Sequence, residues 1–201
     1  MAGTNNLDVF QTYVSPEEVN DLPLTSYKGK IVLVTDPEKV PEAIAEISQH
    51  SAVGFDTETR PTFKKGQFYH VSLIQIGIPG KVFLFRINET GLTDEIAGLL
   101  SNEAILKLGV GLHDDVIALQ KIKSFDSAGF IEIHKYVEDL GVRNTGLRKL
   151  AAIILSIRIS KSQQTSNWDN ARLSENQLRY AATDAWVCLE MYNKLVEKGF
   201  A

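Results

Sequence analysis

Three apolar runs decide the fold of this chain: AVGFD at residues 52–56, VSLIQIGI at 71–78 and VFLFRI at 82–87. The first run is short and mostly apolar, as in a central strand, and the second alternates apolar and polar residues. Pro79 and Gly80, between the second and third runs, are turn residues. Three strands joined by short connections predict an antiparallel meander.

The sequence before and after the meander predicts helices and further strands. Residues 31–34 are a short strand, and Asp36 is the cap of a helix that ends near His50. Beyond the meander, a strand at 105–110 lies between helices at 93–100 and 114–122, and such alternation implies parallel pairing.

The last third is mainly helical. One helix covers 146–155, and a capping-box pair, Ser174 and Gln177, opens another that runs to about Lys198. The predicted fold is therefore α/β: a mixed sheet, an antiparallel meander plus parallel strands, flanked by helices.

Composition limits the domain organisation and the cellular setting. The chain has 201 residues, 44% of them hydrophobic, which suits one globular domain. We expect residues 1–25, which are polar, to form a loosely ordered arm and residues 26–201 to form the domain. The single cysteine, Cys188, excludes an internal disulfide. With no secretory signal and no apolar run near ~20 residues, we expect a cytoplasmic protein with no membrane contact.

The net charge of −4 is unusual for a protein that binds nucleic acid, because such proteins are mostly basic. A site that holds cations with carboxylates is acidic until the metal ions are counted, however. The charge therefore leaves nucleic acid open as a partner.

The first candidate motif is FDTET at residues 55–59. Asp56 and Glu58 are two apart, so in a strand both side chains leave the same face. Two carboxylates side by side at the end of a buried strand repel each other unless a cation lies between them. Taken alone, the motif fits a strand that ends in a solvated acidic turn better, because Asp-x-Glu is a common tripeptide.

The second candidate motif is VGLHDD at residues 110–115, where a predicted strand runs into a helix. Acids are favourable at a helix N-terminus, so we expect Asp114 to be the cap and Asp115 to lie near the end of the sheet. His113 is either a substrate contact or a polar turn residue.

The third candidate motif is YAATDA at residues 180–185. Tyr180 and Asp184 are four apart and share one helix face. The alanines between them allow the helix to approach the sheet closely, where a phenol and a carboxylate need partners. The alternative is a Tyr–Asp pair at the helix surface.

Together the four acids indicate a site for metal-assisted hydrolysis of a phosphodiester. Two Mg²⁺ or Mn²⁺ ions can generate a hydroxide near neutral pH and stabilise the departing oxyanion, and these hard cations prefer oxygen ligands. The sequence has no Cys cluster and no His-rich pattern, which argues against zinc.

These three motifs resemble the exonuclease motifs of the DEDD superfamily, tyrosine subgroup, in the branch of ribonuclease D and the Werner-syndrome helicase exonuclease domain. The resemblance runs from about Ile31 to Lys198 and includes GLRKL at 146–150, SNW at 166–168 and LSENQLRYAATDA at 173–185. It implies a ribonuclease-H-like fold and stepwise release of nucleoside 5′-monophosphates from a DNA or RNA 3′ end.

The resemblance also implies roles for individual residues. Asp56, Glu58 and Asp184 would bind the metal that activates water, Asp56 would also reach the second metal, and Asp115 would hold that metal directly or through water. Tyr180 would hydrogen-bond the attacking water. Thr59 and Glu58 would lie near the terminal 3′ nucleotide. Thr57 and His113 are further candidate substrate contacts. Many proofreading relatives have Asn four residues before this Asp; here the residue is Gly111, as in the Werner-like branch.

Basic side chains near the site are candidates for phosphate contacts. Lys64 and Lys65 follow the first motif, and Phe63, Phe68 and Tyr69 beside them could stack a base or pack in the core. Arg148, Lys161 and Arg172 are further candidates from the C-terminal half. No obligate protein partner is evident.

Two other functions compete with the exonuclease. One is a catalytically silent module of the same fold that binds nucleic acid or protein, and the other is an endonuclease. The sequence leaves open the choice between DNA and RNA, because a contact to the 2′-hydroxyl leaves no legible pattern.

Overall fold

The computed structural model describes residues 10–201, and its centre is one six-stranded sheet with the order β1-β4-β3-β2-β5-β6. β2, β3 and β4 pair antiparallel, whereas the pairs β1–β4, β2–β5 and β5–β6 are parallel. The predicted mixed sheet with an antiparallel meander is confirmed. The strands are β1 Lys30–Val34, β2 Ala52–Thr59, β3 Val71–Ile78, β4 Lys81–Arg86, β5 Leu106–Gly109 and β6 Phe130–Glu132.

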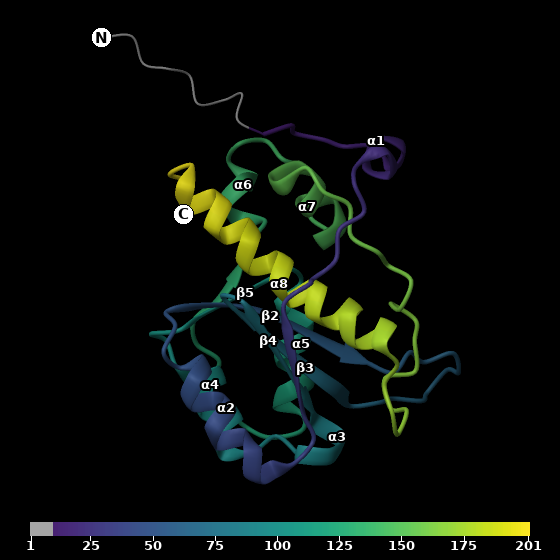
Figure 1. Cartoon of the computed structure of the whole chain (residues 1–201), viewed down its shortest axis with the longest axis vertical. Coiled ribbons are helices and arrows are strands. Elements are labelled where there is room, and N and C mark those ends of the chain that lie inside the picture. Colours follow the sequence, from purple (N-terminus) through teal and green to yellow (C-terminus); the bar gives the residue numbers. More distant parts are fainter. Residues whose placement is uncertain (1–9) are drawn as a thin grey trace.

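Helices cover both faces of the sheet, and the longest, α8, crosses one face diagonally (Figure 1). α2 and α4 pack on the opposite face, while α6 and α7 lie beside the C-terminal half of α8. The helices are α1 Pro16–Asp21, α2 Val40–Ile47, α3 Ile87–Thr90, α4 Asp94–Ser101, α5 Leu112–Gln120, α6 Lys135–Glu138, α7 Leu147–Leu155 and α8 Glu175–Glu197, with a 3-10 turn, Pro37–Lys39, before α2.

The strand β2 presents different side chains to the two faces. Val53 and Phe55 are fully buried in the apolar core shared with α2 and α4. Gly54 points to α8: a Cβ at Gly54 would lie 1.8 Å from the Ala185 carbonyl oxygen, so only glycine permits this contact. Gly77 on β3 makes a similar but looser approach, at 3.3 Å. α8 therefore lies almost directly on the sheet backbone.

Helix ends follow the predicted capping residues with one exception. The Ser174 and Gln177 side chains form the predicted capping box of α8, and Asp36 caps the turn before α2. The prediction of Asp114 as a cap is wrong. The helix α5 begins earlier, after Gly111 with φ 78°, and the Glu132 carboxylate of β6 accepts hydrogen bonds from the Gly111 and Leu112 amides at 2.9 and 2.7 Å.

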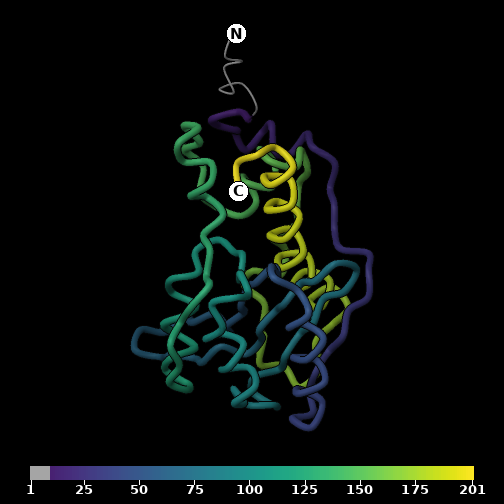
Figure 2. Tube along the Cα trace, turned by 90° about the vertical axis from the view of Figure 1, so that its left-hand side faces the viewer, coloured from purple at the N-terminus to yellow at the C-terminus, as the bar shows by residue number. Residues whose placement is uncertain are grey.

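The N-terminal part of the chain packs against α7. Residues 1–9 of the expected arm lie outside the described residues, so its division from the domain at residue 25 stays a prediction. Within residues 10–25, a capping box of Ser15 and Glu18 starts α1, and Val14 and Val19 are buried in the core cluster that contains α7. Figures 1 and 2 both place this segment beside α7.

Among the described helices, none combines the length and the apolar character needed to cross a membrane.

Candidate functional site

Three carboxylates meet between β2 and α8. Asp56 and Glu58 share one face of β2, and Asp184 reaches them from α8. One oxygen of each carboxylate lies within 4.8 Å of the other two. Asp184 is 4% exposed, while Asp56 and Glu58 are half-buried. The structure thus brings together three of the four acids that the sequence singled out.

Small residues determine this meeting. Ala181, Ala182 and Ala185 are fully buried on the side of α8 that faces the sheet. Because Gly54 lets Ala185 touch the backbone of β2, the adjacent residue Asp184 comes within reach of Asp56, two positions along the strand. The close approach predicted from the alanines is confirmed, and the alternative of a surface Tyr–Asp pair is wrong for Asp184.

The electrostatics of this carboxylate cluster favour a bound cation. Burial, and then the neighbouring Asp184 and Asp115, raise the pKa of Asp56 well above its usual range. Burial and the same kind of repulsion raise the pKa of Glu58, and burial raises the pKa of Asp184. A divalent ion would offset this repulsion, and an all-oxygen donor set suits Mg²⁺ or Mn²⁺. The residues present therefore fit the metal ions that the sequence predicted.

Asp115 lies at the edge of the cluster, on the α5 side. The Thr57 hydroxyl donates a hydrogen bond to its carboxylate, and Thr57 leaves β2 on the face opposite to Asp56. Burial raises the pKa of Asp115 to about 6, and Asp114 and Glu132 act in the same direction, against the Thr57 hydrogen bond. Thr57, expected near the substrate, therefore has its hydroxyl directed to Asp115.

Tyr180 lies one helical turn before Asp184 and lines two hollows of the surface. Its ring packs against fully buried Trp168, with the ring centroids 6.1 Å apart. The burial of Trp168 anchors the loop that carries it against α8. Burial and the nearby Asp184, Glu58 and Asp56 raise the pKa of Tyr180, so its hydroxyl keeps its proton at neutral pH.

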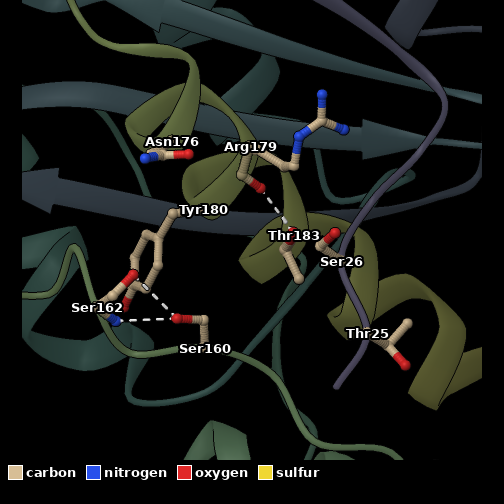
Figure 3. A pocket seen from close by; sticks show the side chains of 8 residues that line it. All are labelled: Thr25, Ser26, Ser160, Ser162, Asn176, Arg179, Tyr180 and Thr183. Atoms are coloured by element: carbon tan, nitrogen blue, oxygen red, sulfur yellow. Dashed lines mark hydrogen bonds between the residues drawn. The ribbon is translucent and has the colours of Figure 1, made fainter. Parts of the chain in front are cut away.

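The smaller hollow, of about 230 Å³, is lined by residues with polar side chains, several of them hydroxyl groups. In Figure 3 the Tyr180 ring points toward the segment that carries Ser160 and Ser162, while the Arg179 side chain points away from it. Ser160 and Ser162 are joined by a 3.0 Å hydrogen bond between their hydroxyls. The larger hollow, of about 420 Å³, lies between α1 and α7 and includes both Tyr180 and Asp184 in its lining.

The other predicted substrate contacts lie around the cluster. Thr59 ends β2 at a register shift and is half-buried, and His113 is exposed at the start of α5. Lys64 and Lys65 are exposed in the loop of residues 60–70. Phe63 and Phe68 in the same loop are 83% and 90% exposed, so the possibility that Phe68 packs in the core is wrong.

Two polar residues near the cluster were not predicted from the sequence. Gln75 of β3 lies opposite Asp56 in the strand register and is fully buried, and its side-chain oxygen has no hydrogen-bond partner within residues 10–201. A glutamine in the apolar run 71–78 could have indicated it. Glu132, which holds the start of α5, follows no recognisable pattern.

Comparison with known proteins gives a consistent result. A family model described as 3′-5′ exonuclease matches residues 31–199. The chain is 32% identical over 196 residues to the bifunctional 3′-5′ exonuclease/ATP-dependent helicase WRN of Mus musculus, in an alignment that covers 90% of this chain and 14% of that protein. It is 30% identical over 174 residues to ribonuclease D of Haemophilus influenzae, covering 84% of this chain and 42% of that protein. The chain thus spans less than half the length of these two curated relatives.

The solved structures agree on the architecture. The Nibbler EXO domain of Aedes aegypti superposes with a TM-score of 0.77 at 25% identity, covering 87% of this chain and 92% of that chain. The six-stranded mixed sheet with flanking helices is the ribonuclease-H-like fold of exonucleases, as the sequence predicted.

Proposed function

This chain belongs to the 3′-5′ exonuclease family, and we propose that it is itself an active, metal-dependent 3′-5′ exonuclease. It would hydrolyse the terminal phosphodiester of a DNA or RNA 3′ end and release nucleoside 5′-monophosphates one at a time. The observation that carries the proposal is the convergence of Asp56, Glu58 and Asp184, with oxygens within 4.8 Å of one another, in a setting that opposes their ionisation.

The acids divide into a central set and an outer one. Asp56, Glu58 and Asp184 would hold the first divalent ion, and Asp56 together with Asp115 the second. When bound, two Mg²⁺ or Mn²⁺ ions supply a hydroxide near neutral pH and stabilise the departing oxygen. The Thr57 hydroxyl orients Asp115 for its role, which agrees with the position of Asp115 at the edge of the cluster.

Tyr180 would orient the attacking water with its hydroxyl. The raised pKa of this phenol argues against a role as general base near neutral pH, because a base must be available in its deprotonated form. Trp168 behind the ring fixes the direction in which the hydroxyl points. Tyr180 is therefore assigned to positioning, and the removal of the water proton is assigned to the metal site.

Nucleic acid would enter past the exposed groups around the cluster. Lys64 and Lys65 would neutralise phosphates, and the exposed rings of Phe63 and Phe68 could stack on bases. Thr59 and His113 are neighbours of the acids in the sequence and would contact the terminal nucleotide. The positive charges of Lys64 and Lys65 would offset the repulsion between the acids and the phosphates.

The test is cleavage of a 5′-labelled oligonucleotide, run in parallel on single-stranded DNA, recessed duplex DNA and RNA with Mg²⁺ or Mn²⁺. A ladder shortening from the 3′ end, which EDTA stops, is the expected result. Internal cuts would instead indicate an endonuclease. Absence of metal-dependent cleavage on every substrate would indicate a silent module and refute the proposal.

A further inference from the structure

The larger hollow has an unusual combination of linings. Pro16, Val19 and Leu147 give it an apolar side, and Arg148, Lys149 and Lys161 give it three cations. It also reaches Tyr180 and Asp184, and Asp184 is one of the three acids of the carboxylate cluster. We call this hollow the α1–α7 groove. A planar apolar group joined to an anion is the chemistry that matches it, and a nucleotide has both parts.

One side of the groove comes from outside the region that defines the family. The family model starts at residue 31, whereas α1 spans Pro16–Asp21. This segment is nevertheless firmly attached. The Val14 amide donates a 2.9 Å hydrogen bond to the buried Asn144 side chain, and the Arg143 amide donates to the Thr12 carbonyl at 2.9 Å. One side of the groove is therefore contributed by residues that precede the region matched by the family model.

The N-terminal segment also contacts two of the three cations of the groove, Arg148 and Lys149. The Arg148 Nη2 donates a 2.8 Å hydrogen bond to the Asn20 side chain of α1, and the Lys149 ammonium lies 5.3 Å from the centre of the Tyr13 ring. Asn20 is a neutral acceptor, so the charge of Arg148 has no carboxylate partner in that contact. In these two contacts both cations are held by neutral side chains.

Arg148 has an unmet hydrogen-bonding requirement. Its Nε is buried and, among the described residues, has no hydrogen-bond partner. A buried donor without a partner is costly, and guanidinium groups bind phosphate oxygens through several N–H groups at once. A phosphodiester in the groove would accept hydrogen bonds from the guanidinium N–H groups on the groove side, while Asn20 holds Nη2.

We propose that the α1–α7 groove binds one unpaired nucleotide of the substrate strand next to the scissile phosphate. Arg148 contacts its phosphate, Asn20 is the positioning residue for Arg148, and the apolar side made by Pro16, Val19 and Leu147 receives the base. This rests on the proposed exonuclease function for the identity of the ligand. It makes α1 a specificity element, which favours 3′ ends whose last nucleotides are unpaired.

Steady-state cleavage of a single-stranded oligonucleotide tests the arginine. Arg148→Ala should raise KM about five- to tenfold, as loss of a partly exposed charged hydrogen bond does, with kcat changed less than about twofold. Asn20→Ala should raise KM by a smaller factor, about threefold, because it only frees the guanidinium. Arg143→Ala, which removes an exposed arginine outside the groove, is the matched control and should keep the wild-type KM.

The two variants separate binding from folding. A purely structural role for Asn20 would lower the unfolding temperature and reduce active enzyme, which lowers kcat and leaves KM in place. A rise in KM with unchanged kcat supports the groove. Wild-type KM values in both Arg148→Ala and Asn20→Ala would overturn it.

A binding measurement tests the groove even if the protein does not cleave nucleic acid. Fluorescence anisotropy with a labelled single-stranded oligonucleotide in Ca²⁺ compares the wild-type Kd with that of Arg148→Ala and Arg143→Ala. If the wild type cleaves nothing but Arg148→Ala binds more weakly than Arg143→Ala, the proposed function fails and the groove stands as a nucleic-acid site. Equal Kd values in all three proteins would overturn the groove whether or not cleavage occurs.

The base-binding side is tested with a substrate that lacks one base. An abasic residue is placed in turn at each of the last positions of the strand, and the wild-type KM is measured. One position should raise KM about fivefold or more, in line with the loss of a buried stacking contact. If none of the positions changes KM, the apolar side holds no base, and that part of the proposal is wrong.

Discussion

The two faces of the central sheet are built on different principles, although the same strands form both. On the face toward α2 and α4, large apolar side chains such as Phe55, Phe83 and Phe85 interdigitate. On the face toward α8, glycines and alanines bring helix and strand backbones into contact, and carboxylates occupy the remaining space. Along β2, Val53 and Phe55 point to the apolar core, and Gly54 and Asp56 point to α8.

The difference shows how the site is held. Side chains that fill a core can adjust to a change of volume at a neighbouring residue, whereas the backbone contact at Gly54 leaves no room for adjustment. Carboxylates that repel one another need rigid surroundings, because a flexible structure would relax and separate them. Close packing on one face therefore fixes the acids, and bulky packing on the other supplies stability.

The largest expected effect comes from removing an acid on the α8 face. Asp56→Asn or Asp184→Asn should reduce cleavage by about a thousandfold or more, because metal binding is lost. Without metal, each variant should unfold at a higher temperature than the wild type, since burial and repulsion oppose these charges. Cleavage rates and thermal unfolding in EDTA measure both effects.

Asp114→Asn is the matched control, because Asp114 is an exposed acid beside Asp115. It should keep the wild-type rate and the wild-type unfolding temperature. Full activity in Asp56→Asn or Asp184→Asn would contradict the assignment of the site.

The next effect comes from filling the backbone contact. Gly54→Ala should destabilise the protein by about 3 kcal/mol, because its Cβ would overlap the Ala185 carbonyl. The shift of α8 should also reduce the cleavage rate of the folded enzyme about a hundredfold, since Asp184 moves with it. Gly77→Ala, with its looser 3.3 Å contact, should show a smaller version of both changes.

Gly98→Ala on α4 is the control, and it should stabilise the protein instead of destabilising it. Gly98 is exposed within a helix, and a methyl group added there would meet no atom within 4 Å, so alanine should stabilise by about 0.5–1 kcal/mol. Urea unfolding of the three variants gives the free energies. Equal destabilisation by Gly54→Ala and Gly77→Ala would show that the backbone contact is not the decisive constraint.

A smaller loss of activity is expected at Tyr180. Tyr180→Phe should lower kcat about tenfold, because it removes one orienting hydrogen bond and keeps the ring packed on Trp168. Since the pKa of the phenol is raised, the pH–rate profile of the wild type should show no loss from Tyr180 ionisation below about pH 10. A pH limb that disappears in Tyr180→Phe would instead make Tyr180 a general base.

The sequence predicted the α8 face well because its determinants are local. Asp56 and Glu58 follow from strand alternation, and Tyr180 and Asp184 follow from helix spacing beside alanines. The antiparallel meander of β2, β3 and β4 also followed, since short connections permit few topologies. Resemblance to known motifs then selected Asp115 over Asp114.

Features that depend on contacts distant in the chain could not be predicted. Glu132 replaces the expected cap of α5 from 20 positions away, and no spacing rule connects the two. The packing of α1 on α7 joins Asn20 to Arg148 across 128 positions. The polar composition of this segment gave no sign of the packing, because two buried valines, Val14 and Val19, are too few for a periodic signal.

A further prediction concerns an exception on the apolar face. Lys107 of β5 is fully buried beside Val53, donates a 2.7 Å hydrogen bond to the Asn102 carbonyl, and lies 5.2 Å from the centre of the Phe130 ring. Burial lowers its pKa to about 8. Lys107→Met should therefore stabilise the protein at pH 7 by about 2 kcal/mol, because it removes a buried charge.

The stability difference between wild type and Lys107→Met should change with pH. Below about pH 8 both the folded and the unfolded chain carry the proton, so the full penalty is present. Between about pH 8 and 10.5 the unfolded chain binds more protons at Lys107, and wild-type stability rises relative to that of Lys107→Met. Lys28→Met, at an exposed lysine, should give no such trend. A difference between wild type and Lys107→Met that stays constant over this range would mean that water reaches the ammonium, and that the face toward α2 and α4 is less completely closed than its phenylalanines indicate.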